Sequence, residues 1–347
     1  MSVKYVPVQW GRNKWLYDAV LIVCVVAYVW IFLALGVPDA DTTRPVDGAI
    51  VRMRAFGSCA FLMLSVILCI GPLARLEPRF LPLLYNRRHF GVLTTAVALS
   101  HALAVLDWYY NFSPTPQLQA LLFSNTSYGQ LVGFPFEAFG LFALLALALL
   151  AATSHDFWLN FLSAPLWKTL HLLIYPAYAA VIAHVAFGYL QDTANPAFAM
   201  VVAGGAFSVA ALHVAAFVSQ ARETNSSDEW ISVGRWDAIA DGRAQIVRIA
   251  GNERAAVFRN GNSLCAVSNA CAHQNGPLGE GRIIDGCITC PWHGFQYRPE
   301  DGCSPAPFTE KIPTYRLRLD GDTVLIHRTA NAPGTAQPPL LLEEEVR

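Results

Sequence analysis

Long uninterrupted runs of apolar residues fill the first two thirds of the chain. Six of them are long enough to cross a bilayer as helices, and they cover residues 15–36, 55–73, 90–108, 129–152, 166–190 and 197–220. Aromatic residues such as Trp15 and Trp108 stand at the ends of several runs, as is typical of the membrane–water interface. The pattern predicts a bundle of six transmembrane helices over residues 15–220, preceded by a short N-terminal segment, residues 1–14.

The pattern changes to short alternating segments after a polar stretch at residues 221–228, which we interpret as a linker. Brief strand-like segments, punctuated by turns such as Asn260-Gly261 and Asp320-Gly321, predict a small all-β domain over residues 229–328. The remainder, residues 329–347, is rich in Ala and Pro and ends in acidic residues, so we predict a disordered tail. The predicted fold class is a membrane α-helical bundle followed by a small all-β domain.

The distribution of Lys and Arg predicts how the bundle lies in the membrane. Basic residues gather before the first run and in the loop that contains Arg75, Arg79 and Arg87, whereas residues 111–128 contain none. Because basic loops stay in the cytoplasm, we expect both termini and the β domain to be cytoplasmic, in the cytoplasmic (inner) membrane. The first loop opposes this assignment with Arg52 and Arg54, although neighbouring acidic residues partly offset them.

Composition agrees with a membrane protein and excludes other classes. Charged residues make up 14% and apolar residues 54% of the chain, which departs from soluble proteins in both respects. The net charge of −1 gives no sign of nucleic-acid binding. The eight cysteines are scattered, so they do not form a disulfide framework.

Two loops of the β domain contain metal-binding residues in a mixed pattern. Cys271 and His273 form the first pair, and Cys290 and His293 form the second pair after sixteen intervening residues. Two thiolates and two imidazoles suit a [2Fe–2S] cluster in which one iron takes both cysteines and the other takes both histidines. A zinc site with the same four ligands is the alternative, but such sites usually pair like ligands in each arm.

The stretch from Cys271 to Gly294 resembles the ferredoxin-like branch of the Rieske family. The cytochrome bc-type branch of that family has an extra cysteine in each loop and a hydroxyl donor where this chain has Phe295. We expect Tyr297 to remain as a hydrogen-bond donor to a cysteine sulfur. Because fewer donors to sulfur lower the potential, the resemblance implies a carrier of low to middle potential.

Histidines within the apolar runs are the second set of candidates. His101 lies thirteen residues past Arg88 and His184 sixteen past Lys168, which places both roughly 20–24 Å along their helices. Histidines at one depth in parallel spans can ligate a haem b iron from both sides. His171 lies near the basic end, where His89 is its possible partner for a second haem; we expect Pro176 to bend the fifth span between His171 and His184.

The motif Arg87-Arg88-His89-Phe90-Gly91 with His101, and the run from Trp167 to Tyr175 with His184, resemble the ferric-reductase-like transmembrane domain. The similarity is greatest to the haem b membrane subunits of periplasmic methionine-sulfoxide reductase systems. That resemblance implies haem ligation by His101, His171 and His184. It does not extend to His89, because the family usually has an apolar residue there.

Together these features predict an oxidoreductase that transfers electrons across a membrane. A cytoplasmic reductase or ferredoxin would reduce the cluster, and one or two b haems would carry the electron to an extracytoplasmic acceptor. The alternatives are a quinol- or quinone-linked Rieske–cytochrome b oxidoreductase and a non-catalytic redox sensor or assembly factor. A Rieske oxygenase is excluded, because outside the cluster the C-terminal half offers only His327 toward a two-histidine, one-carboxylate iron site.

Overall fold

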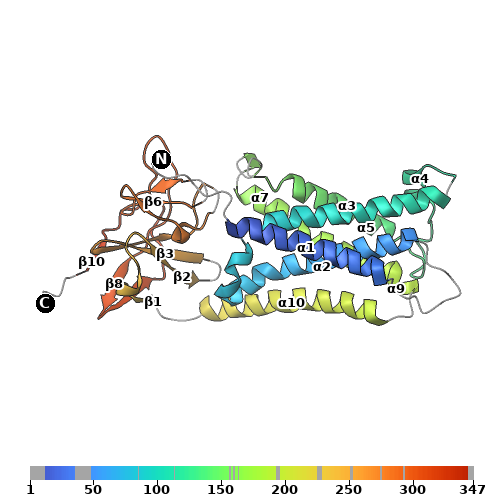
Figure 1. Cartoon of the computed structure of the whole chain (residues 1–347). Coiled ribbons are helices and arrows are strands. Elements are labelled where there is room, and N and C mark those ends of the chain that lie inside the picture. Colours follow the sequence, from blue (N-terminus) through green and yellow to red (C-terminus); the bar gives the residue numbers. More distant parts are fainter. Residues whose placement is uncertain are drawn as a thin grey trace. The chain divides into compact units, whose positions relative to one another are not determined.

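The computed structural model describes residues 12–35, 48–84, 86–112, 114–155, 158, 161–162, 164–192, 196–224, 229–250, 253–273, 276–291 and 294–342. The chain forms two compact units, which divide between Ala216 and Phe217. The first unit is helical and the second is almost entirely β structure (Figure 1). The fold therefore agrees with the predicted class.

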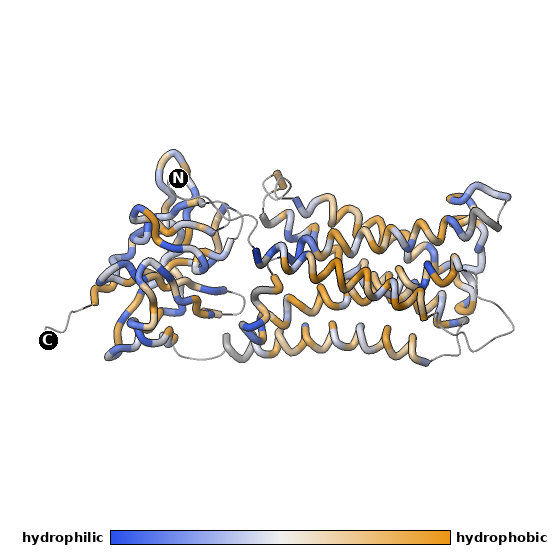
Figure 2. The backbone as a smooth tube through the Cα atoms, in the orientation of Figure 1, coloured by the Kyte–Doolittle hydropathy of each residue, from blue (hydrophilic) through white to orange (hydrophobic). Residues whose placement is uncertain are grey.

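Long helices lie side by side along the helical unit (Figure 1). The helices are α1 (Arg12–Leu35), α2 (Gly48–Leu76), η1 (Pro78–Leu84), α3 (Arg87–Phe112), α4 (Gln117–Phe123), α5 (Glu137–Ala152), α7 (Ala164–His171), α8 (Ile174–Phe187), α9 (Tyr189–Asp192) and α10 (Pro196–Thr224). Apolar residues predominate along these helices (Figure 2). Many of them are exposed; Val23 and Trp30 of α1, for example, are 65% and 68% exposed. Apolar side chains exposed in such numbers match a lipid environment, so this unit is a multi-pass membrane domain.

Five helical segments within the described residues are long and apolar enough to span a membrane, and they include the α7–α8–α9 segment Leu166–Gln191. The fourth predicted span, 129–152, is helical only from Glu137 onward, which leaves the shorter apolar helix α5. The residues before it form turns, and Gly133 adopts a left-handed backbone with φ of 79°. A hydropathy pattern alone does not show where the turns end and the helix begins.

The fifth predicted span is interrupted between α7 and α8, at Leu172 and Leu173. Pro176 has no N–H to donate to the carbonyl of Leu172, which instead accepts from Tyr175 N–H at 3.1 Å. The expected bend thus lies one turn before the proline. It directly follows His171.

Helix α2 runs antiparallel to α3, and both contribute to the interior of the unit (Figure 1). Phe61 and Leu64 of α2 pack with Leu147 of α5 and Tyr178 of α8 in one buried cluster. The Tyr178 hydroxyl shares a hydrogen bond of 2.8 Å with Ser65 of α2. A buried polar pair of this kind fixes α8 against α2 in one register.

The described residues of the β unit form three small antiparallel sheets. Their strands are β1 (Trp230–Arg235), β2 (Ala244–Ala250), β3 (Glu253–Asn260), β4 (Ser263–Ser268), β5 (Arg282–Ile284), β6 (Cys287–Thr289), β7 (Gln296–Tyr297), β8 (Leu317–Asp320), β9 (Thr323–His327) and β10 (Leu340–Leu341). The sheet orders are β1-β9-β8, β10-β4-β3-β2 and β5-β6-β7. One buried cluster includes Val257 of β3 and Val324 of β9, and a second includes Phe258 of β3 and Ile288 of β6.

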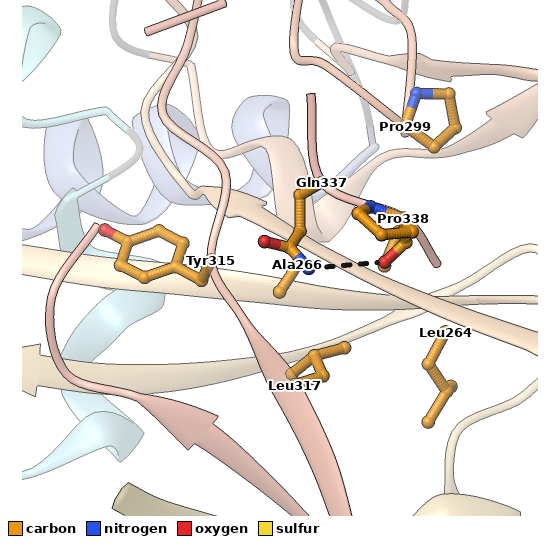
Figure 3. Close-up of a pocket in the computed structure, with 8 residues that line it drawn as sticks. Leu264, Ala266, Pro299, Tyr315, Leu317, Gln337 and Pro338 are labelled. Carbon is orange, nitrogen blue, oxygen red and sulfur yellow. Dashed lines mark hydrogen bonds between the residues drawn. The ribbon is translucent and has the colours of Figure 1, made fainter. Parts of the chain in front are cut away.

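The prediction of a disordered tail is wrong for residues 329–342. Strand β10 pairs with β4, and the Leu342 side chain is buried in the core. Gln337 and Pro338 line one side of a small pocket whose other wall includes Leu264 of β4 (Figure 3). The leucine run supplies enough apolar surface to order a segment whose Ala/Pro composition suggested otherwise. At the predicted linker, 221–228, α10 continues to Thr224; residues 225–228 and the end of the tail lie outside the described residues.

Candidate functional site

The two cysteine-bearing loops start from neighbouring parts of one buried core. Cys271 lies beyond β4 and Cys290 directly follows β6, and both side chains are 1% exposed within the same cluster. The N–H of Cys290 donates to Phe295 O at 2.8 Å, and Gly294, with φ of 68°, closes the turn. Only a residue without Cβ adopts this backbone readily, which explains the glycine after His293.

Tyr297 of β7 holds the first loop. Its hydroxyl lies 3.3 Å from Cys271 Sγ and accepts the Ala272 N–H at 2.9 Å. Burial, and then the neighbouring Cys271 thiolate, raise the pKa of Tyr297 far above its ordinary value, so the phenol keeps its proton. Because the Ala272 N–H donates to the Tyr297 oxygen, the Tyr297 O–H is oriented to donate to the Cys271 sulfur, as we expected from the sequence.

Aromatic rings cover the histidine of the first loop. The His273 ring stacks on Phe295 with centroids 5.0 Å apart and planes 9° apart, and Phe295 packs in turn against Phe308. Phe295 is 4% exposed. The stack fixes the imidazole plane and limits the access of water from that side.

The donor set fits a [2Fe–2S] cluster better than one zinc ion. A zinc ion usually takes like ligands from each arm, whereas here each loop offers one cysteine and one histidine. A two-iron cluster instead needs two separate pairs. Cys271 and Cys290 supply buried thiols, and His273 stands at the half-buried edge; His293 lies outside the described residues.

The helical unit brings two of the predicted histidines close together. The rings of His101 on α3 and His184 on α8 have centroids 6.1 Å apart and planes at 81°. His101 Nδ1 lies 2.9 Å from Met53 O, and His184 Nδ1 lies 2.9 Å from Phe136 O. A carbonyl only accepts, so each Nδ1 carries the proton and each Nε2 keeps its lone pair for a metal.

Each of these rings lies against a glycine. A Cβ on Gly57 would lie 2.9 Å from His101 Nδ1, and a Cβ on Gly140 would lie 2.7 Å from His184 Nδ1. Gly57 follows the accepting Met53 by one helical turn, just as Gly140 follows Phe136. The missing side chain leaves the carbonyl accessible from the side, so the imidazole can reach it.

This arrangement fits a metal bound between the two rings. Two imidazoles on opposite sides of one metal, with bonds of about 2 Å to nitrogen, have ring centroids about 6 Å apart. The observed separation of 6.1 Å between His101 and His184 agrees with that value. In both rings the Nδ1 hydrogen bond leaves the Nε2 lone pair for a metal.

The other candidate histidines lie elsewhere. His171 ends α7, stacks on Trp167 with centroids 3.8 Å apart, and has Nδ1 3.0 Å from Trp167 O. His89 faces α1, where its Nδ1 lies 2.7 Å from Asp18 Oδ2. Asn86 donates to the other oxygen of Asp18 at 2.9 Å. His89 is therefore engaged with the first helix, in a contact that the sequence did not suggest.

Sequence reasoning found the two facing histidines but missed what positions them. Gly57 and Gly140 are unremarkable in helices rich in small residues, and the accepting carbonyls leave no sequence signal. A glycine one turn after each carbonyl could have suggested a close approach, but which side chain approaches depends on the pairing of helices.

Comparison with known proteins identifies both units. The family model described as "Rieske [2Fe-2S] domain" matches residues 229–316. The family model described as "Ferric reductase like transmembrane component" matches residues 56–182. The ferredoxin subunit of anthranilate 1,2-dioxygenase from Burkholderia cepacia is 35% identical over 92 residues, which are 26% of this chain and 84% of that protein. A cholesterol 7-desaturase of Ciona intestinalis is 32% identical over 88 residues, 25% of this chain and only 18% of the relative.

Among solved structures, the ferredoxin of carbazole 1,9a-dioxygenase from Nocardioides aromaticivorans matches 29% of this chain and 98% of its own length. The identity is 23% and the TM-score 0.27.

Proposed function

The chain belongs to the Rieske [2Fe–2S] family and joins that domain to a ferric-reductase-like transmembrane component, and we propose that it transfers electrons across a membrane. In this proposal a cytoplasmic reductase or ferredoxin delivers one electron at a time to the Rieske domain. His101 and His184 would hold a b haem, which would supply one-electron redox chemistry between the Rieske domain and an extracytoplasmic acceptor. The observation that carries the proposal is the facing pair of histidines, with both Nδ1 atoms bonded to backbone carbonyls.

The bound cluster and haem supply the one-electron redox chemistry, and the protein sets where it occurs and at what potential. Tyr297 donates to the Cys271 sulfur and so stabilises negative charge there. Phe295 shields the His273 ring on one side. These contacts would adjust the cluster without taking part in bond making.

In the helical unit the chain's own residues fix the two imidazoles. Met53 and Phe136 accept the Nδ1 protons, which sets the tautomer of both rings. Gly57 and Gly140 make the approach possible. Preorganised ligands reduce the structural change that accompanies each electron, which favours rapid transfer.

The cofactor inventory tests this proposal. The full-length protein in detergent should yield haem b by pyridine haemochrome assay, together with about two iron atoms and two acid-labile sulfides per cluster. Substituting Cys290→Ser should remove iron and sulfide and retain haem, whereas His101→Ala or His184→Ala should remove the low-spin haem and retain the cluster. A protein that binds zinc in place of iron and sulfide, or that binds no haem, would overturn the proposal.

Identifying the electron donor and the electron acceptor requires a second measurement. A cluster midpoint potential near or above about +200 mV would favour quinol oxidation over reduction by a ferredoxin-type donor. If the reduced protein is not reoxidised by ferric chelates, quinones, oxygen or a periplasmic reductase, the sensor or assembly role would be favoured.

A further inference from the structure

The outer face of the sheet β1-β9-β8 carries arginine and tryptophan side chains. The strand register places Trp230 directly opposite His327. It places Arg318 opposite Leu325, which lies two positions from His327 on β9. Arg316 precedes Arg318 by two residues and therefore points to the same side of β8. The alternate residues of the three strands pack on the core, so these side chains form the face that the core does not use.

Contacts across the strands join these side chains into one cluster. The Arg318 guanidinium lies over the Trp230 ring, 4.3 Å from its centroid, and so reaches from β8 across β9 to β1. Arg316 Nη2 donates to His327 Nε2 at 2.7 Å. Stacking on an aromatic ring uses the face of a guanidinium and leaves the N–H groups at its edge for an anion.

The two arginines of this face differ from Arg235 on the same sheet. Arg235 is paired with Asp237 at 2.7 Å. Arg316 and Arg318 are both exposed and form no ion pair with any residue that the structure describes. Asp320 points to the same side further along β8 but pairs with neither arginine. Within the described residues, the positive charge at this end of the face is therefore not compensated.

A short stretch of chain ties this face to a membrane helix. Helix α10 contains the candidate span Pro196–Ser219 and ends at Thr224, and Trp230 opens β1 six residues later. Six residues reach at most about 20 Å when fully extended, so Trp230 stays within that distance of the end of α10. A tether of this length presents lipid headgroups to the face at a high effective concentration.

The face lies on a different core from the cluster ligands. Val324 and Ile326 of β9 belong to one buried cluster of side chains, whereas Cys271 and Cys290 belong to the other. An electron donor bound to this face would therefore not lie beside the loops that carry the cysteines. Anionic headgroups have no such requirement. Their phosphates match arginine in charge and geometry, and tryptophan is enriched at the membrane–water interface.

We propose that Arg316, Arg318 and Trp230 bind the headgroups of anionic phospholipids and hold the β unit on the membrane surface. Each arginine near an anionic surface favours binding about fivefold, so the pair raises the ratio of bound to unbound β units about 25-fold. Binding would hold the iron–sulfur cluster at a fixed orientation to the bilayer. The inference uses the cluster as a probe and needs no haem, so it goes beyond the proposed electron transfer and stands independently of it.

The test is electron paramagnetic resonance of the reduced cluster in oriented membrane films. The full-length protein is reconstituted into phosphatidylcholine alone or into a mixture with phosphatidylglycerol, and a spin-labelled lipid confirms that each film is ordered. The g values of a reduced [2Fe–2S] cluster differ along its axes. Its spectrum therefore changes with the angle of the film only where the β unit keeps one orientation. The wild type should show this angular dependence in the anionic mixture and lose most of it in phosphatidylcholine.

Two variants separate the arginines of this face from other charge. Arg316→Gln combined with Arg318→Gln should lower the ratio of oriented to unoriented cluster about 25-fold in the anionic mixture. Arg235→Gln is the matched control, because it removes the same charge from an arginine of the same sheet that is already ion-paired. It should behave like the wild type.

Three results would overturn the inference. Angular dependence that persists in phosphatidylcholine or in the double variant would mean that a protein contact orients the β unit. Absence of angular dependence in every film would mean that nothing holds it. Angular dependence that appears only after a soluble redox protein is added would assign the face to that protein. The integrated cluster signal shows whether the double variant is folded, and if it is not, the wild type in the two lipid mixtures still decides the question.

Discussion

Replacing Gly140 with alanine should weaken binding of the haem that we propose His101 and His184 hold. The new Cβ would lie 2.7 Å from His184 Nδ1, about 0.7 Å inside ordinary van der Waals contact. The ring would have to move by about that amount, which would stretch its bond of 2.9 Å to Phe136 O beyond hydrogen-bonding range. Overpacking costs about 1–3 kcal/mol and the lost hydrogen bond about 1 kcal/mol. Loss of a group that orients a ligand lowers metal affinity about 10- to 100-fold.

The assay is the ratio of low-spin haem to protein after purification, followed by haem transfer to an excess of apomyoglobin to compare affinities. Gly204→Ala is the matched control, since it makes the same change in a membrane helix where nothing lies within 4 Å of the added Cβ. Gly57→Ala should behave like Gly140→Ala, with a Cβ 2.9 Å from His101 Nδ1. Full haem occupancy and unchanged affinity in Gly140→Ala would refute the reasoning, because the glycine would then be no more than a helix-packing residue.

Three further predictions concern the β unit. Tyr297→Phe removes the hydrogen-bond donor to the Cys271 sulfur. Because the reduced cluster then loses about 1 kcal/mol of hydrogen-bond stabilisation, its midpoint potential should fall by about 40 mV. An unchanged or higher potential in a redox titration would contradict this prediction. Leu342→Ala removes a buried side chain and should lower the unfolding free energy of the β unit by about 2–3 kcal/mol. Denaturant titrations that monitor the cluster absorbance would measure this. An unchanged unfolding free energy would support the prediction of a disordered tail. Burial raises the pKa of Cys265 to about 12, so only about one thiol in ten thousand is ionised at pH 8. Iodoacetamide should therefore label Cys265 only after denaturation. Rapid labelling of Cys265 in the native protein would contradict this prediction.

Most patterns confined to one segment were read correctly from the sequence. Five of the six apolar runs correspond to helices long enough to span a membrane within the described residues. Counting residues along two of them identified the depth at which His101 and His184 meet, because helical rise per residue is nearly constant. Alternating segments gave the β unit. The effect of Pro176 was also foreseen, although its consequence lies one turn earlier, where the carbonyl of Leu172 loses its partner.

Features that depend on how segments pair were not predictable in the same way. A shift of one residue turns a helical side chain by about 100°, so His89 and Arg87 face different helices although two positions separate them. The bond between His89 and Asp18 joins α1 to α3, and nothing in either segment specifies the other. The same holds for the leucines of β10, whose partner β4 lies far away in the sequence.

The surroundings of the cluster determine which way electrons are expected to flow. Relative to the bc-type branch, Tyr297 retains one hydroxyl donor, and Phe295 replaces the other with a ring that cannot donate. A missing donor leaves the negative charge added on reduction less stabilised, and an apolar ring beside His273 acts in the same direction, because low polarity disfavours the more charged state. Both effects lower the potential. A low potential suits reduction by a ferredoxin-type donor and transfer onward to haem, whereas oxidation of a quinol needs a high potential. The exchange at Phe295 therefore supports the proposed direction of transfer, in which electrons enter at the β unit and pass to the histidine pair in the helices.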